Sequence, residues 1–187
     1  MAQLIERIGP VTLKPRRLAP FQSLVQAIIY QQLSGKAAET ILGRFRELFG
    51  NGQFPTPEQV LKVEPERLRS AGLSKPKANY IQGVGAHAVA GRLPTLTACD
   101  QLTDAEIIER LTEIKGVGRW TAEMFLMFNL GRPDVLPVHD LGVRKGFQIA
   151  YGKRKLPQPE SLERLGAKWK PYRSTAAWYL WRAVDSS

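Results

Sequence analysis

At 187 residues, the chain is long enough for one compact domain or two small lobes around a buried core. Its 27 Lys and Arg residues against 17 Asp and Glu give a net charge of +10, which favours a polyanionic partner such as nucleic acid but does not establish one. The single cysteine, Cys99, excludes an internal disulfide, a four-cysteine iron–sulfur cluster and a cysteine zinc site, and two histidines are too few for a convincing metal site.

The predicted elements are almost all helices, each with an apolar face at helical spacing and ends marked by capping residues, glycine or proline. Thr56 before Pro57 and Thr103 three residues before Glu106 are typical helix starts, the second with the spacing of a capping box. Strand-like alternation is almost absent, so the sequence predicts an all-α protein, with Cys99 in a loop. In chain order, we expect helices at 21–32, 34–49, 57–63, 103 to the turn at 116, 120–130, 141–151, 160–169 and 174–184.

The most informative segment is 111–125, which has the pattern of a helix end, a Gly-Val-Gly turn and the start of a second helix. Gly116 and Gly118 lack a Cβ, so the turn can take positive φ angles and lie close to another backbone. The N–H groups after such a turn point outward at a helix N-terminus and form a seat for phosphate. Arg119 places a permanent charge beside that seat.

A structural turn between two helices is the simpler explanation of Gly-Val-Gly, since such turns are common. The longer string favours contact with DNA, because Ile114 and Val117 would pack inside while Arg119 faces outward. The basic residues that would line a phosphate track are Lys115, Arg119, Arg144, Lys145 and the run 153–155. For any one of them alone, a solvated surface position is the simpler assumption.

A second informative segment, 136–145, places Asp140 directly before a predicted helix. By position alone Asp140 is an N-cap. That role is compatible with catalysis, because the helix N–H groups would orient the carboxylate and keep it ionised. Asp134, which fits a turn after Pro133, and His139 are weaker candidates.

One internal echo is present, since residues 66–78 resemble residues 109–122. With one residue skipped before the turn, Gly72 matches Gly116 and Lys75 matches Arg119. Helical hairpins recur by chance, so the echo does not establish a duplication. It predicts a second tight turn that contacts a DNA backbone.

Six aromatic residues are candidates for stacking on a nucleobase, although core packing explains most of them. A rigid aromatic face attracts a cationic base through a cation–π interaction of roughly 0.5–2 kcal/mol. The sequence alone does not decide which ring faces a pocket. The six are Trp120, Trp169, Tyr172, Trp178, Tyr179 and Trp181.

Together, Ile-Lys-Gly-Val-Gly-Arg-Trp-Thr-Ala at 114–122 and Leu-Pro-Val-His-Asp-Leu-Gly-Val-Arg-Lys at 136–145 resemble the helix-hairpin-helix (HhH-GPD) DNA glycosylases. Within that superfamily the chain is most similar to the alkylpurine branch, the 3-methyladenine DNA glycosylase II type. Segments 27–34 and 168–181 support the resemblance, which spans about residues 20–183. It implies one domain over 1–187 with a two-lobed helical fold, a cleft for DNA and base between the lobes, the hairpin at about 105–130 and no N-terminal β domain.

The resemblance also implies roles for single residues. Asp140 matches the catalytic aspartate of the family. Trp120 matches a position that lines the base pocket, and Trp181 matches an aromatic residue that stacks on the flipped base. The turn at 31–34 corresponds to the wedge that fills the gap left by the flipped nucleotide, with Leu33 as the first choice for the plug and Gln32 as the second.

Three features of the resemblance concern what the pocket and hairpin can do. Bifunctional relatives carry a lysine nucleophile where this chain has Trp120, so we expect no Schiff base and no strand cleavage. Met124 and Leu141 stand where another member has tyrosines, which implies a more open base pocket and leaves the base preference undecided. The backbone carbonyls of Ile114 and Val117 would hold a sodium or potassium ion that bridges to a phosphate.

The function implied by the resemblance is base excision repair: hydrolysis of the N-glycosidic bond of alkylated purines by base flipping, without lyase activity. The candidate lesions are 3-methyladenine, 7-methylguanine and 1-methyladenine. The expected partner is double-stranded DNA with damaged bases, and we expect no required cofactor, no iron–sulfur cluster and a monomer. With no apolar run near the roughly 20 residues of a membrane helix and no signal peptide pattern, we expect a cytoplasmic protein, associated with the nucleoid in a bacterium, or a nuclear one in a eukaryote. The alternatives are a non-catalytic module that binds damaged DNA and a strand-cleaving lyase.

Overall fold

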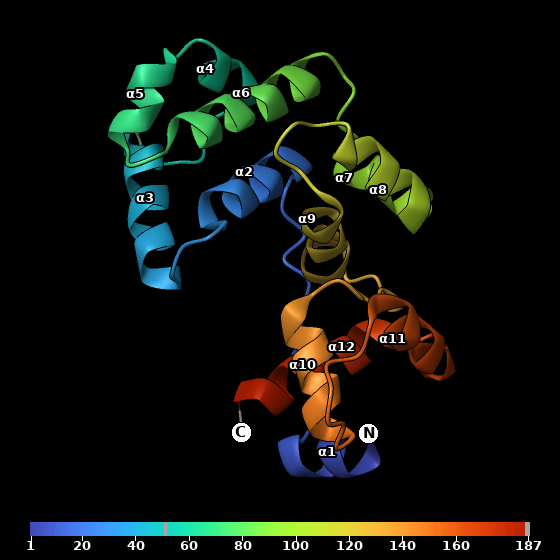
Figure 1. The fold of residues 1–187 in the computed structure, drawn as a ribbon. Helices are drawn as coiled ribbons and strands as arrows, with labels where there is room; N and C mark the ends of the chain where they lie inside the picture. Colours follow the sequence, from blue (N-terminus) through green and yellow to red (C-terminus); the bar gives the residue numbers. More distant parts are fainter. Residues whose placement is uncertain (51, 186–187) are drawn as a thin grey trace. The chain divides into compact units, whose positions relative to one another are not determined.

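The computed structural model describes residues 1–50 and 52–185, and these residues form helices and no strand (Figure 1). The prediction of an all-α protein is therefore confirmed. The chain divides into two compact units. The middle unit comprises Arg17–Phe125, and the terminal unit combines Met1–Arg16 with the residues from Leu126 onward. Within the described residues, no helix is both long and apolar enough to cross a membrane.

In the middle unit, α2 packs against α3 and α6, α6 also packs against the short helices α4 and α5, and α8 packs against α9. The predicted apolar face of α2 is confirmed, since its four residues from Leu24 to Ile29 that recur at helical spacing are fully buried. Phe45 of α3 and Ile81 of α6 complete this core. The helices are α2 (Pro20–Tyr30), α3 (Gly35–Glu47), α4 (Pro57–Leu61), α5 (Pro65–Ser70), α6 (Lys75–Val89), α7 (Leu96–Gln101), α8 (Asp104–Thr112) and α9 (Arg119–Met124).

In the terminal unit, α12 is the central element and packs against α10 and α1. Its residues Ala177, Leu180 and Ala183 are fully buried, and the Tyr179 hydroxyl donates to the carbonyl of Gly9 at 2.8 Å. The elements are α1 (Ala2–Ile8), the π-helical segment η1 (Phe125–Leu130, which begins at the last residue of the middle unit), α10 (Leu141–Ala150), α11 (Pro159–Gly166), the 3-10 turn η2 (Ala167–Trp169) and α12 (Arg173–Asp185).

Side chains cap four of the eight helix starts that were predicted from sequence, those at Ser34, Thr56, Thr103 and Asp140. Thr56 and Thr103 both form complete capping boxes, with Gln59 and Glu106 respectively. Ser34 accepts a hydrogen bond from the backbone N–H of Ala37. Because a capping interaction involves only residues up to three positions apart, these helix starts can be predicted from the sequence.

Three details differ from the sequence predictions. Cys99 lies on α7 and is fully buried, so the prediction that it belongs to a loop is wrong. The predicted helix 120–130 is α-helical only to Met124 and continues as the π-helical segment η1. Helix α1 and the full length of α6 were not predicted.

Candidate active site and nucleic-acid interface

The predicted hairpin is present: α8 ends at Thr112, a turn follows, and α9 begins at Arg119. Gly116 has a φ of +93°, in the left-handed region that favours glycine, and a Cβ there would overlap the ring of Tyr80. Gly118 has an ordinary φ of −87°, and no described atom lies within 4 Å of where its Cβ would be. Glycine at 116 is therefore required by the fold, whereas the surface at 118 is open to a ligand.

The side chains of the hairpin are arranged as predicted. Ile114 and Val117 are buried, whereas Lys115 and Arg119 are exposed. Arg119 Nε lies 3.0 Å from Glu123 Oε1, and the Glu123 side chain is only 4% exposed. Glu123 was not predicted as part of the site, although its i,i+4 spacing from Arg119 is a helix ion-pair signal. This pair holds the guanidinium beside the turn.

Trp120 and Met124 lie on one face of α9, because residues four apart in a helix are neighbours. Trp120 is 47% exposed, and Met124 is half-buried. An indole that is half-exposed on the first turn of a helix is available to a ligand. The structure thus places these two candidates for the base pocket together on the middle unit.

The predicted wedge lies in the turn after α2. Gln32 has a φ of +56°, a left-handed conformation that non-glycine residues seldom adopt. Leu33, the next residue, is 40% exposed. A strained backbone is often found at functional positions, so the turn stays a candidate for the wedge.

Asp140 is the N-cap of α10, as predicted, and is half-buried. Its Oδ1 accepts two hydrogen bonds, at 2.7 Å from the backbone N–H of Val143 and at 2.8 Å from the indole Nε1 of Trp181. The Trp181 ring in turn lies 5.7 Å from the ring of Phe128 at an interplanar angle of 30°. The carboxylate is thereby held in one orientation at the start of a helix.

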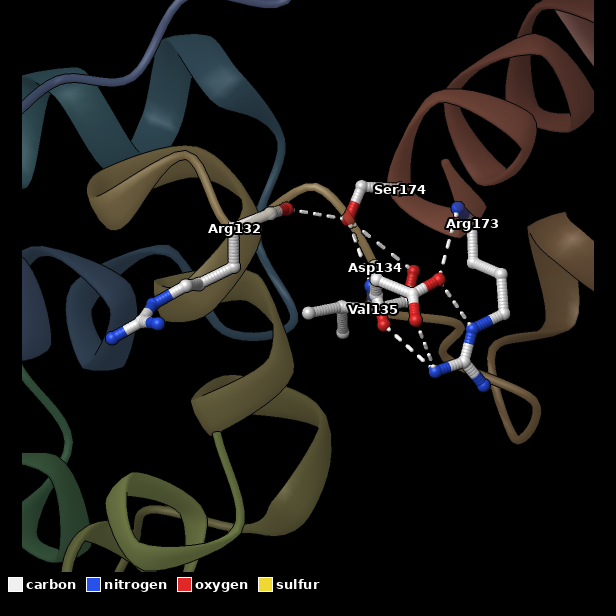
Figure 2. Close-up of polar contacts among 5 residues, drawn as sticks. All are labelled: Arg132, Asp134, Val135, Arg173 and Ser174. Atoms are coloured by element: carbon white, nitrogen blue, oxygen red, sulfur yellow. Dashed lines mark hydrogen bonds and ion pairs between the residues drawn. The ribbon is translucent and has the colours of Figure 1, made fainter. Parts of the chain in front are cut away.

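The loop that leads to Asp140 is fastened to the start of α12 (Figure 2). Arg173 Nε lies 2.6 Å from Asp134 Oδ1, and Nη2 lies 2.9 Å from Oδ2 and 3.0 Å from the Asp134 carbonyl oxygen. Ser174 Oγ donates to the Arg132 carbonyl at 2.6 Å and accepts from the Val135 N–H at 3.0 Å. The hydrogen-bonded Arg173 guanidinium holds the pKa of the Asp134 carboxyl below its usual range.

These contacts separate the two aspartates of this loop. Asp134 has its carboxylate engaged by Arg173 and serves the structure. Asp140, six residues later, is bound to the same helix through Trp181. Helix α12 therefore fastens the loop at both ends, and His139 between them is exposed.

The basic residues predicted to line a phosphate track differ in their exposure and contacts. Arg144 Nε donates to the Pro157 carbonyl at 2.8 Å, so this side chain is anchored on its own unit. Lys145 and the run 153–155 are exposed. Their contact with DNA stays a prediction.

The chain matches the model of a known protein family. The model for "HhH-GPD superfamily base excision DNA repair protein" matches residues 25–171, a range that contains the hairpin and Asp140. The chain belongs to the HhH-GPD superfamily.

Relatives within the superfamily are similar over most of the chain. The DNA-3-methyladenine glycosylase 1 of Schizosaccharomyces pombe is 40% identical over 163 residues, which are 87% of this chain and 72% of the relative. The solved structure of the 3-methyladenine DNA glycosylase of that organism, in complex with abasic DNA, matches with a TM-score of 0.86 at 37% identity and covers 97% of this chain and 89% of its own. The DNA-3-methyladenine glycosidase of Bacillus halodurans matches with a TM-score of 0.87 at 46% identity, over 97% and 82% of the two chains.

One structural feature of this HhH-GPD chain was missed in the sequence. A Cβ on Gly146 would collide with the backbone carbonyl of Leu180, and a Cβ on Gly142 would lie 2.8 Å from Trp181 Cδ1. The two glycines are four residues apart and form a smooth face of α10 on which α12 packs closely. The spacing Gly-x-x-x-Gly at 142–146 was the available signal. The close packing of α12 on this face places Trp181 within hydrogen-bonding distance of Asp140.

Proposed function

We propose that the protein is a monofunctional DNA glycosylase that hydrolyses the N-glycosidic bond of alkylated purines in double-stranded DNA after flipping the damaged base. The names of its relatives and the complex of one of them with abasic DNA support this class of reaction. The observation that carries the proposal is the Asp140 carboxylate, held at the start of α10 by the N–H groups of Val143 and Trp181.

The chemistry needs little beyond a placed carboxylate. A purine alkylated at N3 or N7 is cationic, and when its bond to C1′ breaks it takes the electron pair and leaves as a neutral base. The sugar becomes oxocarbenium-like, and Asp140 would stabilise that positive charge. Water then adds to C1′ and gives its proton to the carboxylate. The candidate lesions are 3-methyladenine, 7-methylguanine and 1-methyladenine.

Particular residues would hold the flipped base, and others would fill the gap that it leaves in the DNA duplex. Trp120 and Trp181 would each attract a cationic ring with their aromatic faces. Met124 and Leu141, where another member has tyrosines, would leave the base pocket more open, so the base preference stays undecided. Leu33, or Gln32 beside it, would fill the gap in the duplex and offset the few kcal/mol that flipping costs. The exposure of Leu33 and of Leu141, 40% and 64%, supports these roles.

The hairpin would grip the DNA backbone. Gly116 shapes the turn, Gly118 leaves room for close approach of a phosphate, and Lys115 and Arg119 would supply charge. Among the described residues, no cluster of three or more His, Cys, Asp or Glu side chains could hold a metal ion, so backbone oxygens are the ligands to consider.

The turn offers backbone carbonyls for the monovalent cation that the resemblance implies. The Ile114 carbonyl accepts one hydrogen bond, from the Val117 N–H at 2.9 Å, and a carbonyl oxygen has a second lone pair. Neutral carbonyls of Ile114 and Val117 suit sodium or potassium, which would supply positive charge for a phosphate. We expect DNA affinity to fall when sodium and potassium are replaced by tetramethylammonium at equal ionic strength. Equal affinity in both salts would contradict the ion site.

Trp120 supports the proposal of monofunctional chemistry. An indole offers no amine for a Schiff base with C1′, so borohydride should trap no covalent adduct with DNA. A trapped adduct would instead identify a lyase.

The test of the proposal is release of free bases from methylated duplex DNA, separated by chromatography. We expect the wild-type protein to release methylpurines and Asp140→Asn to be slower by about 100-fold or more, because Asn caps α10 without a negative charge. DNA affinity should stay unchanged. The matched control is Asp134→Asn, which should lower stability through Arg173 but leave the excision rate of the folded protein near that of wild type.

Each outcome separates two classes of protein. Equal release by wild type and Asp140→Asn would remove Asp140 from the chemistry. No release by either, together with tight binding of the same DNA, would identify a non-catalytic module for damaged DNA.

A further inference from the structure

The turn that carries Gln32 and Leu33 is fastened to the rest of the middle unit by three hydrogen bonds. Lys77 Nζ donates to the Ile29 carbonyl at 2.8 Å and to the Gln31 carbonyl at 2.7 Å. Gln31 Nε2 donates to the Gly116 carbonyl at 3.1 Å. These contacts join residues 46, 48 and 85 positions apart in the chain.

The bonds from Lys77 meet a need of α2. The last carbonyls of a helix have no partner within the helix and carry its negative dipole end, so an ammonium group suits them. Lys77 is half-buried, and its burial lowers the pKa of its ammonium group. The Lys77 ammonium group is therefore held at the end of α2 by two carbonyl oxygens.

The same helix also supports the hairpin. Tyr80, one turn after Lys77 on α6, covers Gly116 so closely that no Cβ fits between them. The first turns of α6 thus contact both the end of α2 and the turn of the hairpin. In addition, the Gln31 side chain joins the end of α2 directly to the hairpin through its hydrogen bond to the Gly116 carbonyl.

The conformation of the turn makes this support necessary. Gln32 has a φ of +56°, which an L side chain rarely adopts without surrounding constraints. The residues on both sides of this strained position differ in their surroundings: Gln31 is held by Lys77 and Gly116, whereas Leu33 is exposed.

We propose that Lys77 and Gln31 are positioning residues that fix the Gln32–Leu33 turn against the hairpin, so that wedge and backbone grip engage the duplex in one register. The inference rests on the proposed glycosylase function. A lysine that merely completes the end of α2 would affect stability alone. A positioning role affects the step in which the wedge enters paired DNA.

The experiment compares Lys77→Met with wild type on two duplexes, with 7-methylguanine opposite cytosine or opposite an abasic site. We expect single-turnover excision to fall about tenfold on the paired duplex and less than about twofold opposite the abasic site, where little pairing must be broken. Lys77→Arg, which keeps a charged donor, should restore most of the rate. Gln31→Leu should act in the same direction with a smaller effect.

Two controls isolate the wedge. Lys75→Met changes an exposed lysine on the same helix, and any loss should be equal on both duplexes. Leu33→Ala should make a further Lys77→Met change nearly silent, because residues that act through one another are not additive.

A readout independent of excision is the fluorescence of 2-aminopurine placed beside the lesion, which rises when the wedge unstacks the duplex. We expect Lys77→Met to lose this rise. Equal loss of excision on both duplexes, an unchanged fluorescence rise, or additivity with Leu33→Ala would overturn the positioning role. Failure of the proposed function gives a different result, since the wild type would then release no base from either duplex while the fluorescence comparison still tests Lys77.

Discussion

The middle unit contains two helical hairpins whose turns have a similar backbone conformation. One joins α5 to α6 around Gly72, and the other joins α8 to α9 around Gly116. The glycines have φ angles of +101° and +93°, and in each case the N-cap of the next helix follows two residues later. The hairpins differ at that N-cap. Ser74 accepts a hydrogen bond from the Lys77 N–H at 3.4 Å, whereas Gly118 has no side chain to offer.

The two hairpins also differ in the basic side chains near the turn, although Lys75 and Arg119, which match in sequence, are both exposed. The α5–α6 hairpin uses a serine for its own helix start and turns Lys77 inward to α2. The α8–α9 hairpin leaves an open surface at Gly118 and turns Arg119 outward. The same backbone shape is therefore combined with two different capping residues, and contact of either turn with a DNA backbone stays a prediction.

Among substitutions in the two hairpins, we expect Gly116→Ala to have the largest effect. The new methyl group would overlap the Tyr80 ring and occupy a left-handed conformation, so we expect a loss of about 2–4 kcal/mol in the free energy of unfolding. Denaturant unfolding measures this loss.

The paired variant is Gly72→Ala. Its nearest neighbour is a side-chain atom, Ile41 Cγ1 at 3.1 Å, which can shift by a few tenths of an ångström. The expected loss of about 1–2 kcal/mol then reflects the backbone alone. Equal losses in the two variants would show that Tyr80 does not constrain Gly116.

Gly118→Ala tests the open surface. A methyl group here meets no described atom and has an ordinary φ, so stability should change by less than about 0.5 kcal/mol. Affinity for duplex DNA should fall about tenfold, equivalent to about 1.4 kcal/mol, because the methyl group blocks approach of the backbone. Fluorescence anisotropy at fixed salt measures the affinity. Unchanged binding would place the DNA backbone elsewhere.

Ser74→Ala addresses the other N-cap. Loss of the cap to the Lys77 N–H should lower stability by about 1 kcal/mol, with DNA affinity maintained. Ser74→Gly, which copies the cap of the α8–α9 hairpin, should lower stability by only about a few tenths of a kcal/mol. Thermal unfolding of both variants distinguishes the two losses, and a reversed order would contradict the capping role.

The smallest effect expected is a pH dependence at α8. The Glu106 carboxylate accepts hydrogen bonds from the Thr103 hydroxyl and N–H, both at 2.7 Å, and these bonds hold its pKa below the usual 4.5. Because the folded pKa is the lower one, the stabilisation is present above about pH 4.5 and is lost as the pH falls through the folded value. Amide exchange, corrected for intrinsic rates, should therefore show loosening at the start of α8 on acidification but not at the start of α6, where a serine caps. Parallel loosening would indicate general acid unfolding instead.

Much of the fold was predictable because its signals are local. Thr103 and Glu106 mark a helix start within four residues, and Gly116 marks the turn that follows. Helix α7 was missed although Thr95 caps it, since its six residues are too few for an apolar period to emerge. For the same reason Cys99 was assigned to a loop.

The candidate site was predictable in its residues but not in its contacts. The N-cap position of Asp140 follows from the next three residues, whereas its bond to Trp181 joins positions 41 apart. The ion pair of Asp134 with Arg173 spans 39 positions. No pattern of short period reports such pairs, so the sequence ranked Asp134 below Asp140 but did not reveal which side chains hold the two carboxylates.

The glycine face of α10 has a consequence for how this protein can change. Gly142 and Gly146 leave no room for variation, because any larger residue would push α12 and Trp181 away from Asp140. Leu141 and Lys145 are exposed on the same helix and are free of that restriction. The helix therefore divides lengthwise into a closely packed side and an exposed side. In the proposed function, a substitution at residue 141 would change the surroundings of the flipped base without moving the neighbouring Asp140.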